Sequence, residues 1–294
     1  MHKSGFVNII GNPNVGKSTL MNSLVGERLS IITSKAQTTR HRIMGIVNGE
    51  DFQIVYSDTP GILKPAYKLQ ETMMRSVNGA LKDADVILYV TDTTEDRERI
   101  SQETIGRIRA SGIPAIVVIN KIDLTTQAEL EVLTSLWHEM LPEAETVAVS
   151  AINGFNVGGL FDEILSKLPA GEPYYPKDVL TDRTVRFFAS EIIREKILLN
   201  YQKEIPYSVE ISIDEYREEP NIDRISATIY VVRESQKGII IGHHGERLKK
   251  VGTAARLELE KFLNKKVFLQ LHVKVNDNWR DSDIQLKRFG YMDM

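Results

Sequence analysis

The sequence contains no cysteine in its 294 residues. This excludes a disulfide framework and a cysteine-ligated zinc site, and it agrees with a reducing compartment. Apolar runs long enough to cross a membrane are also missing, so we expect no membrane-spanning helix. Residues 1–5 lead directly into the first apolar run without the hydrophobic region of a secretory signal, which predicts a cytoplasmic protein.

A large net charge is also missing: the net charge is −3, with 26% charged and 42% hydrophobic residues. These values are typical of a soluble globular protein, and the length allows two domains. From residue 181 onward Lys and Arg slightly outnumber Asp and Glu, whereas the preceding part is acidic. A basic C-terminal part indicates an anionic partner, although the excess alone is weak evidence.

Short β-rich runs alternate with helical patterns as far as residue 168. Strands are expected at 6–10, 43–47, 52–56, 85–90, 113–119 and 146–149, and helices at 18–25 and near 68–82, 98–110, 126–140 and 157–168. Strands that alternate with helices predict an α/β fold with a doubly wound, mostly parallel sheet.

Three prolines and a glycine within residues 169–176 interrupt this pattern and predict a linker. Beyond it we expect a helix at 183–200, strands at 208–213 and 225–232, a short apolar run at 237–241, a helix at 246–263, a strand at 267–275 and a short helix in the tail at 278–294. This order predicts a separate, smaller α+β domain. The proposed boundaries are 1–170, a linker at 171–180, and 181–294.

The strongest motif is a phosphate-binding loop of the form G-x-x-x-x-G-K-[ST], placed between an expected strand and an expected helix. Its glycines let backbone N–H groups face phosphate oxygens, its lysine reaches the β- and γ-phosphates, and its serine is a ligand for Mg²⁺. The predicted phosphate-binding residues are Gly11, Asn12, Pro13, Asn14, Val15, Gly16, Lys17, Ser18 and Thr19.

A second motif, Asp58-Thr59-Pro60-Gly61, follows the strand at 52–56 and is followed by Ile62. A carboxylate at the carboxyl end of such a strand faces the ligand crevice, so Asp58 is a candidate partner of Mg²⁺ and Gly61 of the γ-phosphate. We expect these five residues to form switch II. Switch I is expected in the polar segment 34–40, where Thr39, in preference to Thr38, would bind Mg²⁺ when a γ-phosphate is present.

The base is indicated by Asn120-Lys121-Ile122-Asp123, after the strand at 113–119. An enclosed Asp123 accepts hydrogen bonds from N1–H and the amino group of guanine, a donor pair that adenine does not offer. Lys121 would pack along the base and Asn120 would join neighbouring loops. Ser150-Ala151, after the last strand, would offer a backbone N–H to the guanine O6.

Together these are the motifs of a small GTPase domain. Their order and their exact residues resemble the bacterial Era family. The shared stretches are GNPNVGKST, KAQTTR, DTPG, NKID and SA, with residues 174–176 of the linker and 191–196 of the next helix. The resemblance covers essentially the whole chain. It implies a GTPase domain joined to a type II KH domain, binding of the 3′ end of 16S ribosomal RNA, and a role in 30S subunit assembly.

Hydrolysis of GTP to GDP and phosphate would depend on positioning and electrostatics. Ras-like enzymes carry a water-orienting glutamine at the position of Ile62, which has no hydrogen-bonding group. Either backbone groups or a bound cation orient the water, or the protein is a slow switch that waits for a partner. We expect slow intrinsic turnover. The resemblance implies a K⁺ ion held in part by Asn14; a purely structural Asn14 is the alternative. The expected cofactors are thus GTP or GDP, Mg²⁺ and, in addition, K⁺.

The C-terminal part contains Gly242-His243-His244-Gly245, which opens the helix at 246–263. In KH domains a GXXG loop clamps about four nucleotides of single-stranded RNA. Positive charge around the loop favours RNA, and the apolar residues 239–241 could form a floor under the bases. The predicted RNA-binding residues are Lys237, Gly242, His243, His244, Gly245, Arg247, Lys249 and Lys250; Trp279 and Arg280 either contact RNA or seal the domain.

Other interpretations remain open from the sequence. A membrane-associated signalling GTPase would require peripheral attachment to the inner face of the cell membrane, because no lipidation motif or strong amphipathic anchor is present. A tRNA-modification or large-subunit GTPase would carry a different appended domain. An RNA scaffold with a silent nucleotide site does not fit the intact Lys17, Ser18, Asp58 and Asp123. We expect a monomer.

Overall fold

The computed structural model of the protein describes residues 1–95, 98 and 100–292. The chain divides into two compact units, which are described separately. The first unit comprises Met1–Ile32, Thr39–Pro65 and Met73–Asp182, and the second comprises Thr33–Thr38, Ala66–Thr72 and Arg183–Met294. Two short segments from the N-terminal part of the sequence therefore group with the C-terminal unit.

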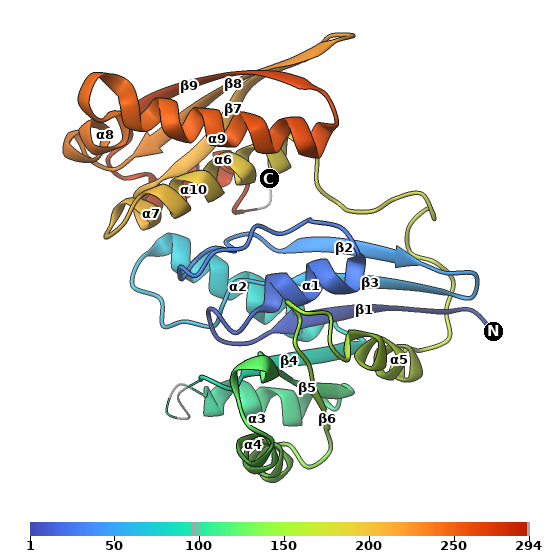
Figure 1. The fold of residues 1–294 in the computed structure, drawn as a ribbon. Helices are drawn as coiled ribbons and strands as arrows, with labels where there is room; N and C mark the ends of the chain where they lie inside the picture. Colours follow the sequence, from blue (N-terminus) through green and yellow to red (C-terminus); the bar gives the residue numbers. More distant parts are fainter. Residues whose placement is uncertain (96–97, 99, 293–294) are drawn as a thin grey trace. The chain divides into compact units, whose positions relative to one another are not determined.

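The first unit is built on a six-stranded sheet with the order β2-β3-β1-β4-β5-β6 (Figure 1). Of these strands, β2 alone runs antiparallel to its neighbour. The strands are β1 (Lys3–Ile10), β2 (Ile43–Asn48), β3 (Phe52–Asp58), β4 (Val86–Asp92), β5 (Ala115–Asn120) and β6 (Glu145–Ala148). The predicted doubly wound, mostly parallel sheet is confirmed.

Both faces of this sheet are covered. Consecutive residues of β4 and β5 are buried, so side chains pointing to opposite faces both lie in a core. One face packs against α2, α3 and α4 through Val77, Ile105, Ile108 and Trp137. The helices are α1 (Lys17–Val25), α2 (Lys68–Lys82), α3 (Gln102–Ser111), α4 (Gln127–Met140) and α5 (Val157–Lys167), and α2 belongs to this unit from Met73 onward.

Capping residues determine where two of these helices begin. Thr126 accepts from the backbone N–H of Glu129, whose side chain accepts from the backbone N–H of Thr126 in return, and α4 starts directly after Thr126 in this capping box. Ser101 caps α3, so this helix begins at Gln102 and not near residue 98 as expected. Residue 99, within the range expected for that helix, lies outside the described residues.

The segment expected to be a linker is hydrogen-bonded to the first unit. The Gln53 side chain accepts from the backbone N–H groups of Tyr174 and Tyr175 at 2.7 and 3.0 Å. Farther along, Leu180 accepts from the backbone N–H of Ile46 at 2.8 Å. Residues 174–180 therefore lie alongside β2 and β3, and the C-terminal segment of the second unit begins at Arg183.

The second unit contains a three-stranded sheet with the order β7-β8-β9, in which β7 is antiparallel and β9 parallel to β8 (Figure 1). Its core forms between α6, α8, α9 and this sheet. The elements are α6 (Val185–Asn200), α7 (Ile205–Ser208), β7 (Glu210–Glu218), β8 (Ile222–Val231), α8 (Glu234–Ile241), α9 (Glu246–Leu263), β9 (Lys266–Val275) and α10 (Asp283–Arg288).

The expected strand at 208–213 is wrong at both ends. A single helical turn, α7, occupies 205–208 because Pro206 suits the first positions of a helix. The strand β7 then continues to Glu218 past a bulge between Ile213 and Glu215. The tail forms the short helix α10, as expected, although residues 293–294 lie outside the described part. No helix among the described residues is long and apolar enough to cross a membrane.

Candidate nucleotide and RNA sites

The phosphate loop connects β1 to α1 and requires glycine at both ends. Gly11 and Gly16 have φ angles of 151° and 96°. A Cβ atom at Gly11 would lie 2.1 Å from the carbonyl oxygen of Val90. The backbone thus turns in a way that other residues would strain, at the amino end of α1, where N–H groups attract anions.

Lys17 is buried within the loop that it serves. Its Nζ donates to the carbonyl oxygens of Gly11 at 3.0 Å and Asn12 at 2.8 Å. Burial lowers its pKa to about 8, against the opposing effect of the carboxylates of Asp58 and Glu95. A cation held this way, beside inward-facing N–H groups, is suited to binding phosphate oxygens.

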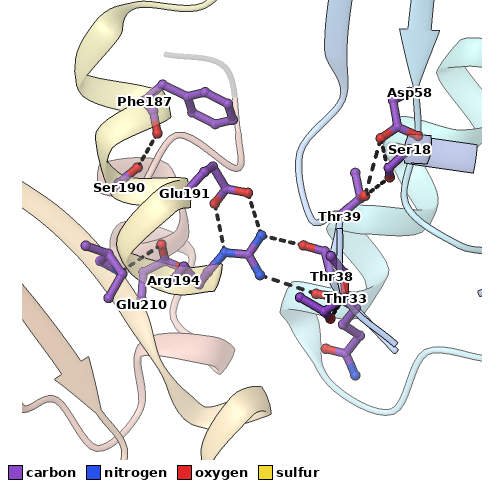
Figure 2. A network of polar contacts seen from close by, with 12 residues as sticks. Ser18, Thr33, Thr38, Thr39, Asp58, Phe187, Ser190, Glu191, Arg194 and Glu210 are labelled. Carbon is purple, nitrogen blue, oxygen red and sulfur yellow. Dashed lines mark hydrogen bonds and ion pairs between the residues drawn. The ribbon is translucent and has the colours of Figure 1, made fainter. Parts of the chain in front are cut away.

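Ser18, Thr39 and Asp58 meet beside the loop, although they come from three separate parts of the chain (Figure 2). Ser18 Oγ donates to Asp58 Oδ2 at 2.7 Å and lies 2.8 Å from Thr39 Oγ1. Thr39 Oγ1 is 3.4 Å from the same carboxylate oxygen. Burial raises the pKa of Asp58, and its hydrogen bonds to these hydroxyl groups oppose this rise.

This cluster fits a hard divalent cation. Asp58 is fully buried, and its second oxygen, Oδ1, has no hydrogen-bond partner within the described part of the chain. A buried, unpartnered carboxylate oxygen beside two hydroxyl groups is the oxygen-rich donor set that Mg²⁺ prefers. Thr38 does not join the cluster: its hydroxyl contacts Thr33 Oγ1 and donates to the carbonyl of Lys35, both at 2.6 Å.

The remaining residues of the expected switch II lie against β1 and the phosphate loop. Thr59 donates its hydroxyl to the carbonyl of Ile9 at 2.7 Å, and it is fully buried. A Cβ at Gly61 would lie 2.8 Å from Pro13, so only glycine lets this segment approach the phosphate loop so closely. Ile62 donates its N–H to Gly11 at 3.1 Å while its side chain packs on the core. Pro60, which stands between Thr59 and Gly61 in the sequence, is also buried.

Asn120 joins two loops of the expected base site. Its Nδ2 donates to the carbonyl of Val15 at 3.0 Å, and its Oδ1 accepts from the N–H of Ala151 at 3.0 Å. Lys121 adopts a left-handed conformation with a φ of 60°. Its Nζ donates to the carbonyl of Asn14 at 2.7 Å and forms an ion pair with Asp92. These contacts tie the phosphate loop to the ends of β4, β5 and β6.

Asp123 is exposed rather than enclosed by the protein as expected. One of its carboxylate oxygens, Oδ1, accepts from Ser150 Oγ at 2.5 Å. Asp123 lies in the short 3-10 helix η2 (Ile122–Leu124), which begins two residues after the end of β5. An accessible carboxylate oriented by a neighbouring hydroxyl can accept the two parallel hydrogen bonds that guanine offers.

Sequence reasoning missed Glu95 and Asp92, two carboxylates beside the phosphate loop. Glu95 accepts from Asn12 Nδ2 and from Thr91 Oγ1, both at 2.5 Å, and burial raises its pKa. Asp92 is the last residue of β4, and Glu95 comes three residues later. This position could have indicated both residues, because the carboxyl ends of parallel strands meet at the ligand-binding edge of the sheet.

The GXXG segment forms the corner between α8 and α9. Gly242 and Gly245 have φ angles of 72° and 80°, and His244 is also left-handed at 47°. A Cβ at Gly242 would lie 2.7 Å from Arg247 Cγ, whereas one at Gly245 would meet nothing within 4 Å. The corner thus exposes backbone at the amino end of a long helix, where phosphate groups are favoured.

Basic side chains surround this corner. Arg247, Lys249 and Lys250 are exposed. Lys237 forms an ion pair with Glu234, with 3.9 Å between Nζ and Oε2. The exposed rings of His243 and His244 pack edge to face with centroids 4.0 Å apart. The expected apolar floor for bases is wrong in one respect, because Ile240 is fully buried in the core of the second unit.

Trp279 is also fully buried, and its indole N–H donates to the carbonyl of Ser208 at 3.2 Å. It therefore seals the second unit and does not stack on RNA. Arg280 lies over the ring of Tyr67 with 4.7 Å from Cζ to the ring centroid, within the same unit. These positions favour the structural interpretation of both residues.

Two family models match the chain. Residues 6–121 match the family described as "50S ribosome-binding GTPase", and residues 204–280 match "KH domain". Among curated proteins, "GTPase Era" of Syntrophus aciditrophicus is 44% identical over 293 residues, covering 99% of this chain and 96% of that protein. "GTPase ERA1, chloroplastic" of Zea mays is 43% identical and covers 99% of this chain and 71% of that protein.

Two solved structures are similar over the full length. One is described as "Era in complex with MgGDPNP and nucleotides 1506-1542 of 16S ribosomal RNA"; it has a TM-score of 0.95, 41% identity and full coverage of both chains. The other is a single-residue variant of Aquifex aeolicus Era "bound to GDP.AlF4-", with a TM-score of 0.95, 42% identity, and coverage of 99% of this chain and 100% of that chain.

Proposed function

This chain belongs to the Era family of GTPases, and on that basis we propose that it is a GTP-hydrolysing switch that binds the 3′ end of 16S ribosomal RNA and assists 30S subunit assembly. The observation that carries the proposal is the cluster of Ser18 with the buried Thr39 and Asp58, which joins the phosphate loop to both switch segments. The GXXG corner in the same chain supplies the RNA-binding output.

In the hydrolysis we propose, the residues of the phosphate loop position GTP and stabilise charge as it develops on the γ-phosphate. Lys17 exchanges its two carbonyl partners for phosphate oxygens. Ser18, Thr39 and Asp58 hold Mg²⁺, which neutralises phosphate charge when bound. Asn120, Lys121 and Asp123 bind guanine, with Ser150 and Ala151 at its edge. Because Ile62 packs on the core, no side chain at that position orients water, and intrinsic turnover is slow.

A K⁺ ion is part of the proposal for catalysis. Asn14 has a left-handed φ of 68° in the loop, and its carbonyl oxygen accepts from Lys121 Nζ. Its side-chain amide oxygen is the ligand we assign to the ion beside the phosphates. Turnover measured in K⁺ and in Na⁺ tests this directly: faster hydrolysis in K⁺ is expected, and equal rates contradict a cation ligand at Asn14.

The RNA site that we propose is the GXXG corner with its basic neighbours. The similar Era structure contains nucleotides 1506–1542 of 16S ribosomal RNA, which supports the 3′ end of that RNA as the target here. Exposed backbone at residues 242–245 lets the sugar-phosphate chain approach closely, and Lys237, Arg247, Lys249 and Lys250 neutralise it.

Crosslinking in cells followed by sequencing of the attached RNA tests this function. We expect crosslinks concentrated at the 3′ end of 16S RNA in the GTP-bound protein, and their loss in Gly245→Asp. Gly245 is the better position to change, because a side chain there meets no neighbouring atom, whereas one at Gly242 collides with Arg247. Gly290→Asp is the matched control, since Gly290 is also left-handed and unobstructed. Crosslinks scattered over unrelated RNAs would defeat the ribosomal assignment.

The proposed location follows from the partner, because a protein that assembles the 30S subunit works in the cytoplasm. We propose that it acts there as a monomer. A peripheral contact with the inner face of the cell membrane belongs to the alternative signalling role. Co-sedimentation with anionic liposomes in the absence of RNA would support that role, and protein remaining in the supernatant would exclude it.

A further inference from the structure

Arg194 on α6 is a buried cation with every edge of its guanidinium group engaged. Its side chain is almost fully buried, as is that of Glu191, one helical turn earlier. Nε and Nη2 donate to the two carboxylate oxygens of Glu191 at 2.7 and 2.5 Å. This bidentate pair fixes the guanidinium plane and leaves its outer edge directed away from the helix (Figure 2).

The outer edge of Arg194 binds the backbone of switch I. Nη1 donates to the carbonyl of Gln37 at 3.4 Å, and Nη2 donates to the carbonyl of Thr38. Gln37 is left-handed, with a φ of 58°. All of these residues belong to the second unit, because Thr33–Thr38 groups with the C-terminal part of the chain.

A second contact holds the same segment to the carboxyl end of α6. Lys35 Nζ donates to the carbonyl oxygens of Leu198 and Tyr201, where the last turn of the helix leaves carbonyl groups without partners in the helix itself. In addition, Gln37 Oε1 accepts from the hydroxyl of Tyr67 at 2.9 Å. Residues 33–38 are therefore fixed by several contacts within the second unit.

The next residue in the chain is the threonine of the cation cluster. Thr38 accepts from Arg194, and Thr39, one peptide bond later, contacts Ser18 and Asp58 in the first unit. Because a peptide unit is planar, the orientation of the Thr38 carbonyl restricts where the Thr39 backbone can begin. The position of Thr39 is thus set from both sides.

We propose that Arg194 is a positioning residue for the switch: it holds the Thr38 carbonyl so that Thr39 reaches the cation in the GTP-bound state. By linkage, a γ-phosphate that fixes Thr39 also favours the second-unit arrangement in which Arg194 binds Thr38. This inference rests on the proposed GTPase function and adds the residue that carries the nucleotide state into the RNA-binding unit.

The test compares affinities for the GTP analogue GDPNP and for GDP, with Mg²⁺ present, in wild type and Arg194→Gln. We expect Arg194→Gln to lower the GDPNP affinity by about tenfold while leaving GDP affinity nearly unchanged, as a coupling of ordinary size implies. Hydrogen exchange at residues 35–40 should speed up only in the GDPNP complex. Arg194→Lys should restore part of the loss, since lysine keeps the charge without the fork.

Two further variants protect this test from a failure to fold. Arg194→Gln leaves Glu191 buried without its cation, so the double variant Glu191→Gln, Arg194→Gln removes both charges together. Arg256→Gln is the control, because Arg256 forms its ion pair with Glu260 along α9, in the same unit. It should leave the GDPNP-to-GDP ratio unchanged.

The possible outcomes distinguish a failure of the proposed role of Arg194 from a failure of the proposed GTPase function. An unchanged GDPNP-to-GDP ratio in folded Arg194→Gln or the double variant overturns the role of Arg194 while the GTPase assignment stands. A wild-type protein that binds neither nucleotide overturns the assignment itself. A loss of GDP and GDPNP affinity by the same factor would show that Arg194 only stabilises the fold, and it would also overturn the proposal.

Discussion

Gly16 and Asn120 lie so close together that a Cβ atom on Gly16 would stand 2.2 Å from Asn120 Nδ2. The glycine of the phosphate loop and the asparagine of the guanine motif are thus matched in shape, because Asn120 fills the space that a side chain at Gly16 would need. The Asn120 side chain donates to Val15, the residue before Gly16. The phosphate and base portions of the site are therefore one packed structure.

Gly16→Ala should accordingly disturb both portions. Because φ is 96° and Asn120 fills the space, we expect GDP affinity to fall by about tenfold or more, which corresponds to about 1.4 kcal/mol of lost binding. Gly112→Ala is the matched control: φ is 67°, but nothing lies within 4 Å of its Cβ. It should lose about 1 kcal/mol of stability and no affinity. Titration calorimetry distinguishes the two, and normal binding by Gly16→Ala would contradict the packing argument.

The two threonines of switch I should behave differently. Thr39→Val removes a hydroxyl that contacts Ser18 and Asp58, so we expect weaker Mg²⁺-dependent binding of GDPNP. Thr38→Val removes a hydroxyl that contacts Thr33 and the carbonyl of Lys35, so it should cost about 1 kcal/mol of stability and leave GDPNP affinity intact. Nucleotide titrations at several Mg²⁺ concentrations check this, and the reverse pattern would assign the cation to Thr38.

Asp123→Asn should change the preferred base. The amide keeps an acceptor for N1–H but presents a donor where guanine offers its amino group, so guanine affinity should fall by roughly a hundredfold, about 3 kcal/mol. Xanthine has a carbonyl at that position, so xanthosine nucleotides should gain affinity. Competition assays with both nucleotides measure the exchange. Asp178→Asn, at an exposed aspartate of the linker, should change neither, and unaltered guanine preference in Asp123→Asn would refute the base assignment.

The low pKa of Lys17 predicts proton uptake when nucleotide binds. Above pH 8 the free protein holds Lys17 largely neutral, and an anionic phosphate favours the protonated amine. GDP binding at about pH 9 should therefore take up a proton, and affinity should decline as pH rises through about 8. Calorimetry in buffers of different ionisation enthalpy measures this uptake, with Lys17→Gln as the control that lacks it. Binding of GDP to wild type without proton uptake would contradict the burial of a titrating amine.

The same shift affects stability in the opposite direction. Lys17 in the unfolded chain keeps its proton up to its ordinary pKa of 10.5, so the unfolded state binds more protons between about pH 8 and 10.5. The contribution of Lys17 to the free energy of unfolding of the nucleotide-free protein should therefore rise with pH in this window. Denaturant titrations of wild type and Lys17→Gln isolate that contribution.

The nucleotide site could be predicted from the sequence because its rules are local. Gly11 and Lys17 follow β1, Asp58 and Asn120 are the last residues of β3 and β5, and the carboxyl ends of parallel strands converge. The family resemblance is confirmed, and so are the sheet and the smaller α+β fold. The choice of Thr39 over Thr38 agrees with the geometry, while its role as a cation ligand stays a prediction.

The features that the sequence did not reveal depend on tertiary contacts. Arg194 is 156 residues from the Thr38 carbonyl that it binds, and no local pattern links them. Glu95 is half-buried and accepts hydrogen bonds from Asn12 and Thr91, which lie apart from each other in the sequence. Ile240 was expected under the RNA bases, but it lies in α8 and packs into the core of the second unit.

The most direct test of the whole account measures binding of an RNA matching the 3′ end of 16S ribosomal RNA in the presence of GDPNP or GDP, with Mg²⁺ in both cases. Fluorescence anisotropy at one fixed salt concentration gives the two affinities with the nonspecific charge contribution held equal. The account predicts tighter binding with GDPNP, and it predicts that Gly245→Asp abolishes specific binding in both states. Equal affinity in the two nucleotide states would contradict a GTP-controlled RNA switch.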